Sequence, residues 1–279
     1  MSVINLKLLE AADLPHEADK VLDPYVILWT TGNRSGACRS TTKEKSNAPN
    51  WNEDFKLHVV DFSKETLMIH VLDKASGEGI GFWRFPIAPI KQNVLHNLWL
   101  SLHSFGKTFF AGKIHVNIHV APVTVAAYNA PPQTFVPYNL NINVEHAVDV
   151  PNVHVTASDP YVSFSIDGGE VYQTRPVKNT TRPLWDKGYS IPLTTTDSVI
   201  NLKLFHNSSK KDKEDEVISF MDIPLGLFEV GKVFYDYYIL APYKRKSGGF
   251  LALRIHLAPA NVIPFSTNND PVGDEPPKD

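Results

Sequence analysis

The sequence predicts an all-β protein made of two antiparallel β-sandwiches in tandem, with about eight strands in each. Three observations carry this prediction: a duplicated pattern, apolar residues that alternate with polar ones, and Pro, Gly, Asn and Asp between the alternating runs. The chain has 279 residues, of which 43% are hydrophobic and 20% are charged. This globular composition and length fit two domains.

The duplication is visible as four pairs of similar blocks that occur in the same order. In each pair the second block follows the first at nearly the same distance along the chain. The pairs are 4–15 and 140–151, 23–26 and 159–162, 49–57 and 183–191, and 112–122 and 249–259. We therefore expect a duplicated domain of roughly 120 residues.

Strands are expected wherever apolar and polar residues alternate. Ile4, Leu6 and Leu8 alternate with Asn5 and Lys7, which is typical of a strand with one buried face. The same alternation occurs at the start of the second copy, and it also occurs in the segment that ends each copy. Helical periodicity is scarce, and the best helical candidate is a short stretch near 88–97.

We predict a first domain over 1–122, a linker over 123–137, a second domain over 138–259 and a tail over 260–279. Three prolines make the linker a semi-stiff connector, although its apolar residues could also pack on a domain. The tail combines four prolines with four acids and one base. We expect it to be acidic and disordered.

Composition argues against several functions. The net charge is −3, so there is no global basic field to hold nucleic acid. The single cysteine, Cys38, is expected to be a packing residue, and the lack of disulfides favours a cytoplasmic setting. His115 and His119 would lie about 13 Å apart on one strand, too far for one metal, and are expected at the surface. We expect no enzyme and no small-molecule substrate.

The opening run 1–15 mixes polar residues into its apolar stretch, so we expect no signal peptide, and no run is long enough for a membrane span. Any membrane contact is therefore expected to be peripheral.

Both copies resemble the C2 domain, a calcium- and phospholipid-binding β-sandwich. The motifs that carry the resemblance are ADLP after the opening strand, LDPYV (22–26), SDPYV (158–162), the two Pro-x-Trp strands and the closing strands GKIHVNIHV and GGFLALRIHL. Each copy begins with the strand that leads into the DPYV loop and ends with the Gly-initiated strand. This order resembles the circularly permuted, type II topology of the family.

The resemblance implies a Ca²⁺ site in the first copy, because members of the family hold this ion with five acidic positions in loops at one end of the sandwich. Asp23 matches the second position, Asp73 the third and Glu78 the fifth, whereas Ala75 stands at the fourth. The first position falls on Glu17, with Asp19 as the alternative. We expect weak binding of one ion; the alternative is a degenerate site whose acids are only solvated.

The second copy departs further from the calcium pattern. Asp159 is kept, but Val153, His206 and Ser208 stand where acids belong, and Glu216 could match the last position. Lysines follow in the same loop. We therefore expect no calcium in this copy.

Basic residues in the second copy are candidates for binding anionic lipid headgroups. They form two groups, one directly before the last strand and one in the loop after His206: Lys244, Arg245 and Lys246, and Lys210, Lys211 and Lys213. The alternative is that these are solvated loop charges, diluted in the second group by neighbouring acids.

These observations predict a non-enzymatic, calcium-responsive protein that binds phospholipid membranes peripherally. The first copy would sense calcium, and the second would bind anionic membranes independently of it. The alternative is a calcium-independent protein–protein adaptor built on degenerate C2 domains.

Overall fold

The computed structural model describes residues 2–15, 21–105, 108–132, 138–153, 158–195, 197–208, 214–259 and 262–266. The chain divides into two compact units, Met1–Thr134 and Phe135–Lys278. No helix long and apolar enough to cross a membrane is found among the described residues.

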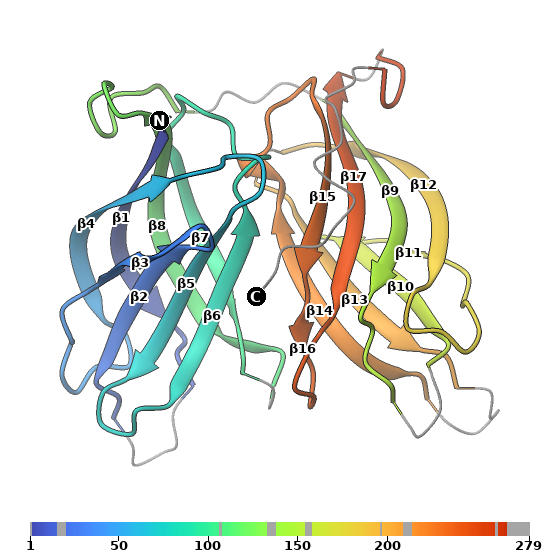
Figure 1. The fold of residues 1–279 in the computed structure, drawn as a ribbon, viewed down its shortest axis with the longest axis horizontal. Helices are drawn as coiled ribbons and strands as arrows, with labels where there is room; N and C mark the ends of the chain where they lie inside the picture. The colour runs from blue at the N-terminus through green and yellow to red at the C-terminus, as the bar shows by residue number, and fades with distance from the viewer. Residues whose placement is uncertain are drawn as a thin grey trace. The chain divides into compact units, whose positions relative to one another are not determined.

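The described residues of the first unit form eight strands: β1 (Ser2–Ala12), β2 (Pro24–Thr30), β3 (Asn33–Arg39), β4 (Asn50–Val59), β5 (Thr66–Asp73), β6 (Gly79–Pro86), β7 (His96–His103) and β8 (Phe110–Pro122). Their order is β3-β2-β5-β6-β7-β8-β1-β4. β6 and β7 are joined by a single residue pair, Phe82 and His103. The sheet therefore folds over at this point into two layers of four strands (Figure 1).

The second unit repeats this plan: β9 (Tyr138–Val148), β10 (Pro160–Ile166), β11 (Val171–Gln173), β12 (Leu184–Leu193), β13 (Val199–His206), β14 (Glu216–Pro224), β15 (Val233–Ile239), β16 (Ala241–Pro242) and β17 (Phe250–Pro259). The sheets are ordered β11-β10-β13-β14-β16 and β12-β9-β17-β15. The two tandem antiparallel sandwiches confirm the predicted fold class. The two-residue β16 adds a ninth strand to the described part of this copy.

The stretch near 88–97, the best helical candidate of the sequence, is not helical. A turn closed by the Ile90 N–H and the Ile87 carbonyl lies there, and β7 begins at His96. Asn93 has a positive φ of 57°, which no α-helix accommodates. In the described residues the helical structure is one 3₁₀ turn, Leu225–Leu227.

The alternating residues of the opening strand face the core as expected. Ile4, Leu6 and Leu8 are each 0% exposed, and the matching residues of β9 are equally buried. Burial of a full aliphatic side chain contributes roughly 1.5–3 kcal/mol, so this stripe is a main source of stability in each copy. Asn5, on the opposite face, is also buried, and its amide donates to the His119 carbonyl at 3.5 Å.

The last strand of each copy lies beside the first, because β8 pairs with β1 and β17 pairs with β9. Two glycines make this close approach possible. A Cβ at Gly112 would lie 2.5 Å from the Ala12 carbonyl oxygen, and one at Gly249 would lie 3.0 Å from that of Asp149. Both glycines also have positive φ values, 87° and 77°. Gly112, the third residue of β8, and Gly249, the residue before β17, are therefore required by the pairing of the last strand with the first.

A buried histidine follows in each of these final strands, and the prediction that His119 lies at the surface is wrong. His119 and His256 are both 0% exposed. The chain turns back after each strand, so that the Tyr128 N–H donates to His119 Nδ1 at 2.9 Å and the Phe265 N–H donates to His256 Nδ1 at 3.0 Å. Burial lowers the pKa of both histidines. Described parts of the predicted linker and tail therefore pack on the copy that precedes them.

The remaining tail positions, 260–261 and 267–279, lie outside the described residues, as does 133–137 of the linker. The exact domain boundaries stay a prediction.

Replacing Leu6 with Ala should lower the free energy of unfolding of the first copy by about 2–5 kcal/mol, because the neighbouring strands cannot collapse into the cavity. Chemical denaturation followed by tryptophan fluorescence measures this change. Val60→Ala is the control, since Val60 is 74% exposed; it should shift stability by less than about 0.5 kcal/mol. Equal effects of the two substitutions would contradict the placement of Leu6 in the core.

Candidate functional site

The loops that carry the predicted site residues meet at one end of each sandwich. In the first copy Pro24 at the start of β2 pairs with Asp73 at the end of β5. In the second copy Pro160 at the start of β10 pairs with His206 at the end of β13. The start of β17 pairs with the end of β9 at the same end. Loops of distant sequence are thereby brought together.

Two predicted calcium ligands of the first copy are in direct contact. The Asp23 N–H donates to Asp73 Oδ1 at 2.8 Å, and the Lys74 N–H donates to the Asp23 carbonyl at 2.9 Å. The Asp23 carboxylate turns the other way, with Oδ1 accepting the Lys45 N–H at 2.7 Å. Asp23 and Asp73 therefore tie three loops together.

Asp73 also caps the turn that follows it. Its Oδ2 accepts the Ser76 N–H at 3.1 Å and the Ser76 hydroxyl at 2.7 Å, and its Oδ1 accepts the Ala75 N–H at 3.4 Å. The side chain is buried, and burial alone would raise the pKa of Asp73. The hydrogen bonds from Ser76, Asp23 and Ala75 outweigh burial and hold this pKa below its ordinary value of 3.8.

By themselves, the described residues of the first copy do not fit a calcium ion. Ca²⁺ takes six to eight oxygens, whereas both Asp73 oxygens already accept hydrogen bonds. No group of three or more Asp, Glu, His or Cys side chains is placed to hold a metal within the described ranges. Glu78 is exposed after this turn, and Ala75 contributes no ligand. Glu17 and Asp19 lie outside the described residues.

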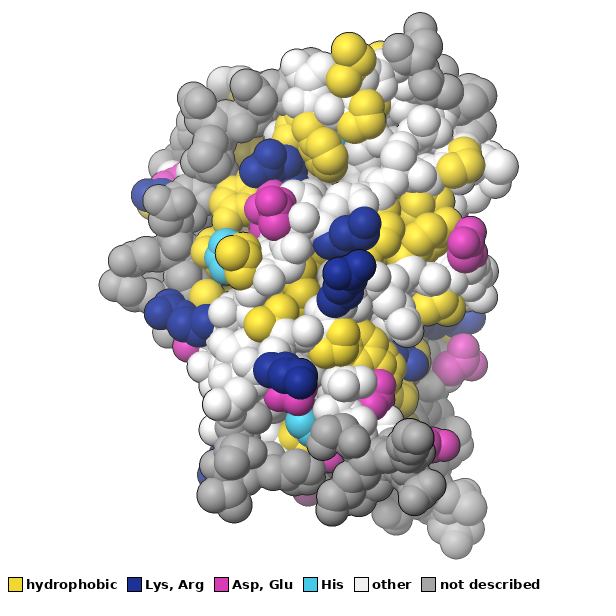
Figure 2. Space-filling view, turned by 90° about the vertical axis from the view of Figure 1, so that its right-hand side faces the viewer, with side chains coloured by type: hydrophobic (Ala, Val, Ile, Leu, Met, Phe, Trp, Pro, Cys, Tyr) yellow, Lys and Arg dark blue, Asp and Glu magenta, His cyan; other side chains and the backbone are white. Residues whose placement is uncertain are grey.

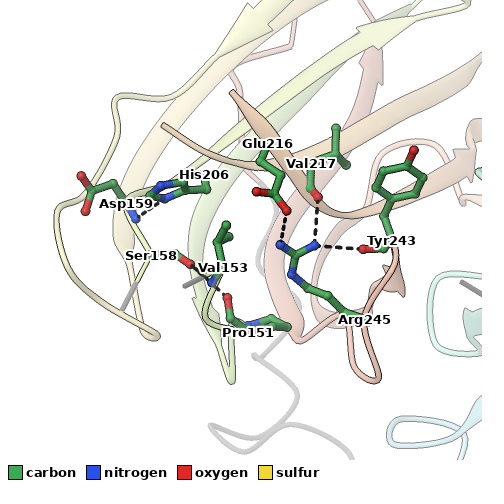
Figure 3. A network of polar contacts seen from close by, with 9 residues as sticks. All are labelled: Pro151, Val153, Ser158, Asp159, His206, Glu216, Val217, Tyr243 and Arg245. Atoms are coloured by element: carbon green, nitrogen blue, oxygen red, sulfur yellow. Dashed lines mark hydrogen bonds and ion pairs between the residues drawn. The ribbon is translucent and has the colours of Figure 1, made fainter. Parts of the chain in front are cut away.

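The second copy repeats the same tie with a histidine in place of the second carboxylate. The Asp159 N–H donates to His206 Nδ1 at 3.0 Å (Figure 3). The Asn207 N–H donates to the Asp159 carbonyl at 2.9 Å, and the Asn179 N–H donates to Asp159 Oδ1 at 2.8 Å. These contacts match those of Asp23 bond for bond. His206 thus accepts the same main-chain hydrogen bond as Asp73, but its imidazole supplies no anionic ligand for a metal ion.

Val153 and Ser158 close the neighbouring loop of the second copy. The Val153 N–H donates to Ser158 Oγ at 3.1 Å, and this hydroxyl donates to the Pro151 carbonyl at 3.1 Å (Figure 3). The side chain at the position expected for the first acid is apolar. Residues 154–157 lie outside the described residues.

Sequence reasoning missed Asp215 in this loop. Asp215 Oδ1 accepts the Ser208 N–H at 2.7 Å, and its Oδ2 accepts the Tyr161 hydroxyl at 2.8 Å. Burial acts to raise the pKa of Asp215, but these donors and nearby His206 hold the pKa below its ordinary value. The carboxylate is used to fix the loop. Asp215 is one of several acids in a run that also contains bases, and nothing in the sequence distinguishes it from its neighbours.

Arg245 pairs with Glu216, the residue that could match the last calcium position. Its guanidinium pairs with Glu216 Oε1 at 2.5 Å and donates to the carbonyls of Tyr243 at 3.0 Å and Val217 at 3.4 Å (Figure 3). The Arg245 side chain is only 13% exposed, compared with 48% for Glu216. A guanidinium bound to the Glu216 carboxylate disfavours a cation there. Arg245 fastens the loop to β14.

Lys244 and Lys246 flank Arg245 and are both exposed. Neither forms an ion pair with a carboxylate of the described residues. The Lys244 ammonium lies 5.0 Å from the centre of the Tyr243 ring. Two unpaired positive charges thus stand on a braced loop at the end of the sandwich. Lys210, Lys211 and Lys213 lie outside the described residues.

Changing Asp73 to Asn should lower the free energy of unfolding at pH 7 by about 1–3 kcal/mol, because a buried multiple acceptor is lost. The folded-state pKa of Asp73 is depressed, so its stabilisation is present above the ordinary pKa of 3.8 and lost as pH falls through the folded pKa. Denaturation of both proteins between pH 7 and pH 2 measures this. The difference between wild type and D73N should shrink at low pH; a constant difference would contradict the role of the carboxylate.

Comparison with known proteins relates these loops to a family. The C2 domain family model matches residues 2–102 and 138–240. Synaptotagmin-3 of Arabidopsis thaliana is 26% identical over 193 residues, which cover 61% of this chain and 35% of that protein. Extended synaptotagmin-1 of Pongo abelii is 26% identical over 212 residues, which cover 67% of this chain and 18% of that protein. The chain thus matches only a minor part of each relative.

Among solved structures, a tandem pair of C2 domains from extended synaptotagmin 2 is 16% identical, with a TM-score of 0.38 over 92% of this chain and 90% of that one. A single C2 domain of plant extended synaptotagmin 1 is 23% identical, with a TM-score of 0.40 over 44% of this chain and 97% of that one. Likenesses of this size carry no argument about function. The family model, however, matches both copies and most of the chain, and this protein therefore belongs to the C2 domain family, as a tandem of two C2 domains.

Proposed function

We propose that this chain is a non-enzymatic, cytoplasmic protein that docks peripherally on anionic phospholipid membranes. The second C2 domain makes calcium-independent contact through the loop 243–247, and the first adds a calcium-dependent contact. The observation that carries the proposal is the pair of exposed lysines, Lys244 and Lys246, on a loop that Arg245 fastens to β14. Membership of the C2 family supports a lipid-binding role.

The electrostatics of the second domain favour a membrane over a metal ion. His206 and the Arg245–Glu216 pair replace the anionic environment that Ca²⁺ needs. Each lysine near an anionic membrane surface contributes roughly 1 kcal/mol, without any metal. Because the braced loop holds its shape, little conformational entropy is lost when it docks.

Calcium binding by the first domain is supported by the difference between the two domains at one position. Asp23 and Asp73 place two carboxylates at the loop end, whereas Asp159 and His206 place one. The depressed pKa keeps Asp73 ionised at neutral pH. Two carboxylates are too few for a strong site, so binding depends on Glu17 or Asp19 and on Glu78 and is weak.

Joining the two domains strengthens both contacts. Once one domain is on the membrane, docking of the other becomes an intramolecular event at high effective concentration. Two weak contacts therefore give a stable attachment that calcium adjusts.

Replacing Lys244 and Lys246 together with Ala should weaken binding of the whole chain to phosphatidylserine-rich vesicles by about 30-fold at low salt, roughly 1 kcal/mol for each charge. Vesicle co-sedimentation without calcium measures this. The loss should diminish above 0.1 M salt, where screening acts within about 10 Å. The control replaces Lys56 and Lys64 of the first domain, both exposed. An equal loss in the control, or no binding by the wild type, would refute the docking loop.

Titration calorimetry of the whole chain with CaCl₂ should reveal one weak binding event. Asp23→Asn should remove it, because one carboxylate is lost while the oxygen that accepts the Lys45 N–H is kept. Asp159→Asn, the matched change in the second domain, should leave the titration unchanged. If Asp159→Asn removes binding and Asp23→Asn does not, the assignment of calcium to the first domain is wrong.

A further inference from the structure

The loop that carries Lys244 and Lys246 also carries a serine. Ser247 comes directly after the one place in the sequence where three bases are consecutive. Two glycines follow it, and the segment 243–249 contains no acid. A hydroxyl group therefore ends a block of positive charge on the proposed docking loop.

The Ser247 side chain is exposed and weakly bound. Its Oγ accepts the Gly249 N–H at 3.3 Å, which is long for a hydrogen bond. Within the described part of the chain this is the hydrogen bond that the side chain makes, and it leaves the hydroxyl proton unused. The oxygen is therefore accessible to a reagent from solution.

A serine after a base is not accessible by virtue of its sequence alone. Ser40 follows Arg39 but is only 5% exposed, accepts the Val26 N–H at 2.9 Å and donates to the Thr41 carbonyl at 2.9 Å. Bases elsewhere are dispersed: on the face shown in Figure 2, Lys and Arg side chains stand singly or in pairs among apolar and uncharged ones. Consecutive bases and an accessible hydroxyl thus come together at Ser247.

The first domain has a different residue at this position. Gly112 and Gly249 match between the domains and both have positive φ values, so Phe110 corresponds to Ser247. Phe110 is 46% exposed, and the segment 104–109 before it contains one base. The hydroxyl and its block of bases are therefore a property of the second domain.

We propose that Ser247 is a phosphorylation site for a protein kinase that selects basic segments, and that the phosphate turns off the membrane contact of the second domain. This inference rests on the docking loop proposed above. Charge patterns decide which segments a kinase accepts, and an acidic substrate groove favours bases before the acceptor. Lys244 and Lys246 are exposed and ready to pair with such a groove.

The conformation of the loop does not protect Ser247. Kinases bind the acceptor segment in an extended form, so the loop has to open. Lys244 has a positive φ of 54°, a conformation that costs free energy for a lysine and that opening relieves. Opening also parts Arg245 from Glu216, and the carboxylates of the kinase groove then take the place of this half-exposed acid.

The chemical step transfers the γ-phosphoryl group of Mg²⁺-bound ATP. The Ser247 Oγ attacks the γ-phosphorus, the bond from this phosphorus to the oxygen that bridges to the β-phosphorus breaks, and ADP leaves. The hydroxyl proton passes to the catalytic aspartate of the kinase. Hydrolysis of the phosphoserine by a phosphatase returns the hydroxyl and releases inorganic phosphate, so the modification is reversible.

The phosphate cancels the charge on which docking depends. A phosphoserine carries about −1.5 to −2 at pH 7. Because Arg245 is paired with Glu216, the charge available to a membrane is that of Lys244 and Lys246. The modified loop is therefore close to neutral, and its phosphate is repelled by anionic headgroups. The first domain keeps its own contact, since Phe110 has no hydroxyl to modify.

The first part of the test treats the whole chain with Mg²⁺, ATP and the catalytic subunit of the cyclic-AMP-dependent protein kinase, which selects bases before serine. Peptide mapping by mass spectrometry should find the phosphate on Ser247. Replacing Lys244 and Lys246 with Ala should slow its incorporation at least tenfold, because the charges that the kinase recognises are lost. The control replaces the exposed Lys56 and Lys64 of the first domain and should leave the rate unchanged.

The second part measures co-sedimentation with phosphatidylserine-rich vesicles without calcium. Phosphorylated wild type should bind at least about 30-fold more weakly than untreated protein at low salt, as expected when two charges are cancelled. Ser247→Glu, with one added negative charge, should weaken binding about fivefold. Ser247→Ala should bind equally before and after kinase treatment. Urea denaturation should give the same midpoint with and without the phosphate, which excludes unfolding as the cause.

The inference is overturned if the kinase leaves Ser247 unmodified, or if phosphorylated and untreated wild type bind vesicles equally. It is also overturned if kinase treatment weakens binding of Ser247→Ala as much as that of the wild type. In these cases the proposed function stands, because it is judged by the untreated protein. If the untreated wild type does not bind the vesicles at low salt, the proposed function fails and this inference falls with it.

Discussion

The loop end of each domain depends on one hydrogen bond from the main chain to a side chain. It joins the N–H of the aspartate in the DPYV motif to an acceptor at the end of a strand about fifty residues later. Asp73 Oδ1 is that acceptor in the first domain, and His206 Nδ1 is the acceptor in the second. A buried N–H without a partner costs free energy, so this position must hold an acceptor but not a charge. The constraint explains how either an aspartate or a histidine can hold this position in the same fold.

The two domains share the residues that hold the sandwich together and differ in the charges on their surfaces. Both domains contain the same strands, a glycine near the start of the final strand and a buried histidine (His119 or His256), because these hold the sandwich together. The charges on the loops and edges differ, because exposed residues there change stability little. The second domain carries exposed bases on its end loop, whereas the first carries the carboxylates of Asp23 and Asp73 at the matching end. One molecule therefore presents surfaces of opposite character.

Several predictions failed where contacts between distant residues decide the outcome. The stretch 88–97 has no helix because pairing with β8 draws His96 into β7. His119 is polar and follows a strand pattern, yet the chain after that strand folds back over it. In the sequence Arg245 is one of three adjacent bases that look equivalent. In the structure it pairs with Glu216 and fastens its loop to β14. Asp215 was missed for the same reason, since its partner Tyr161 lies far away in sequence.

The sequence by itself determined the number of domains, the β-sandwich class, the position of most strands and the loss of acidic positions in the second domain. These properties follow from local alternation, repeated blocks and the identity of residues at matched positions. None of them depends on contacts between residues that are distant in sequence. Only the tertiary structure decided which charged side chains are exposed to a partner and which are bound to other residues of the protein. Lys246 and Arg245 are neighbours in the chain, but one is exposed and the other is bound to Glu216 on β14. The reason is physical: the charge available to a partner depends on burial and on nearby counter-charges, and strands far apart in sequence supply both.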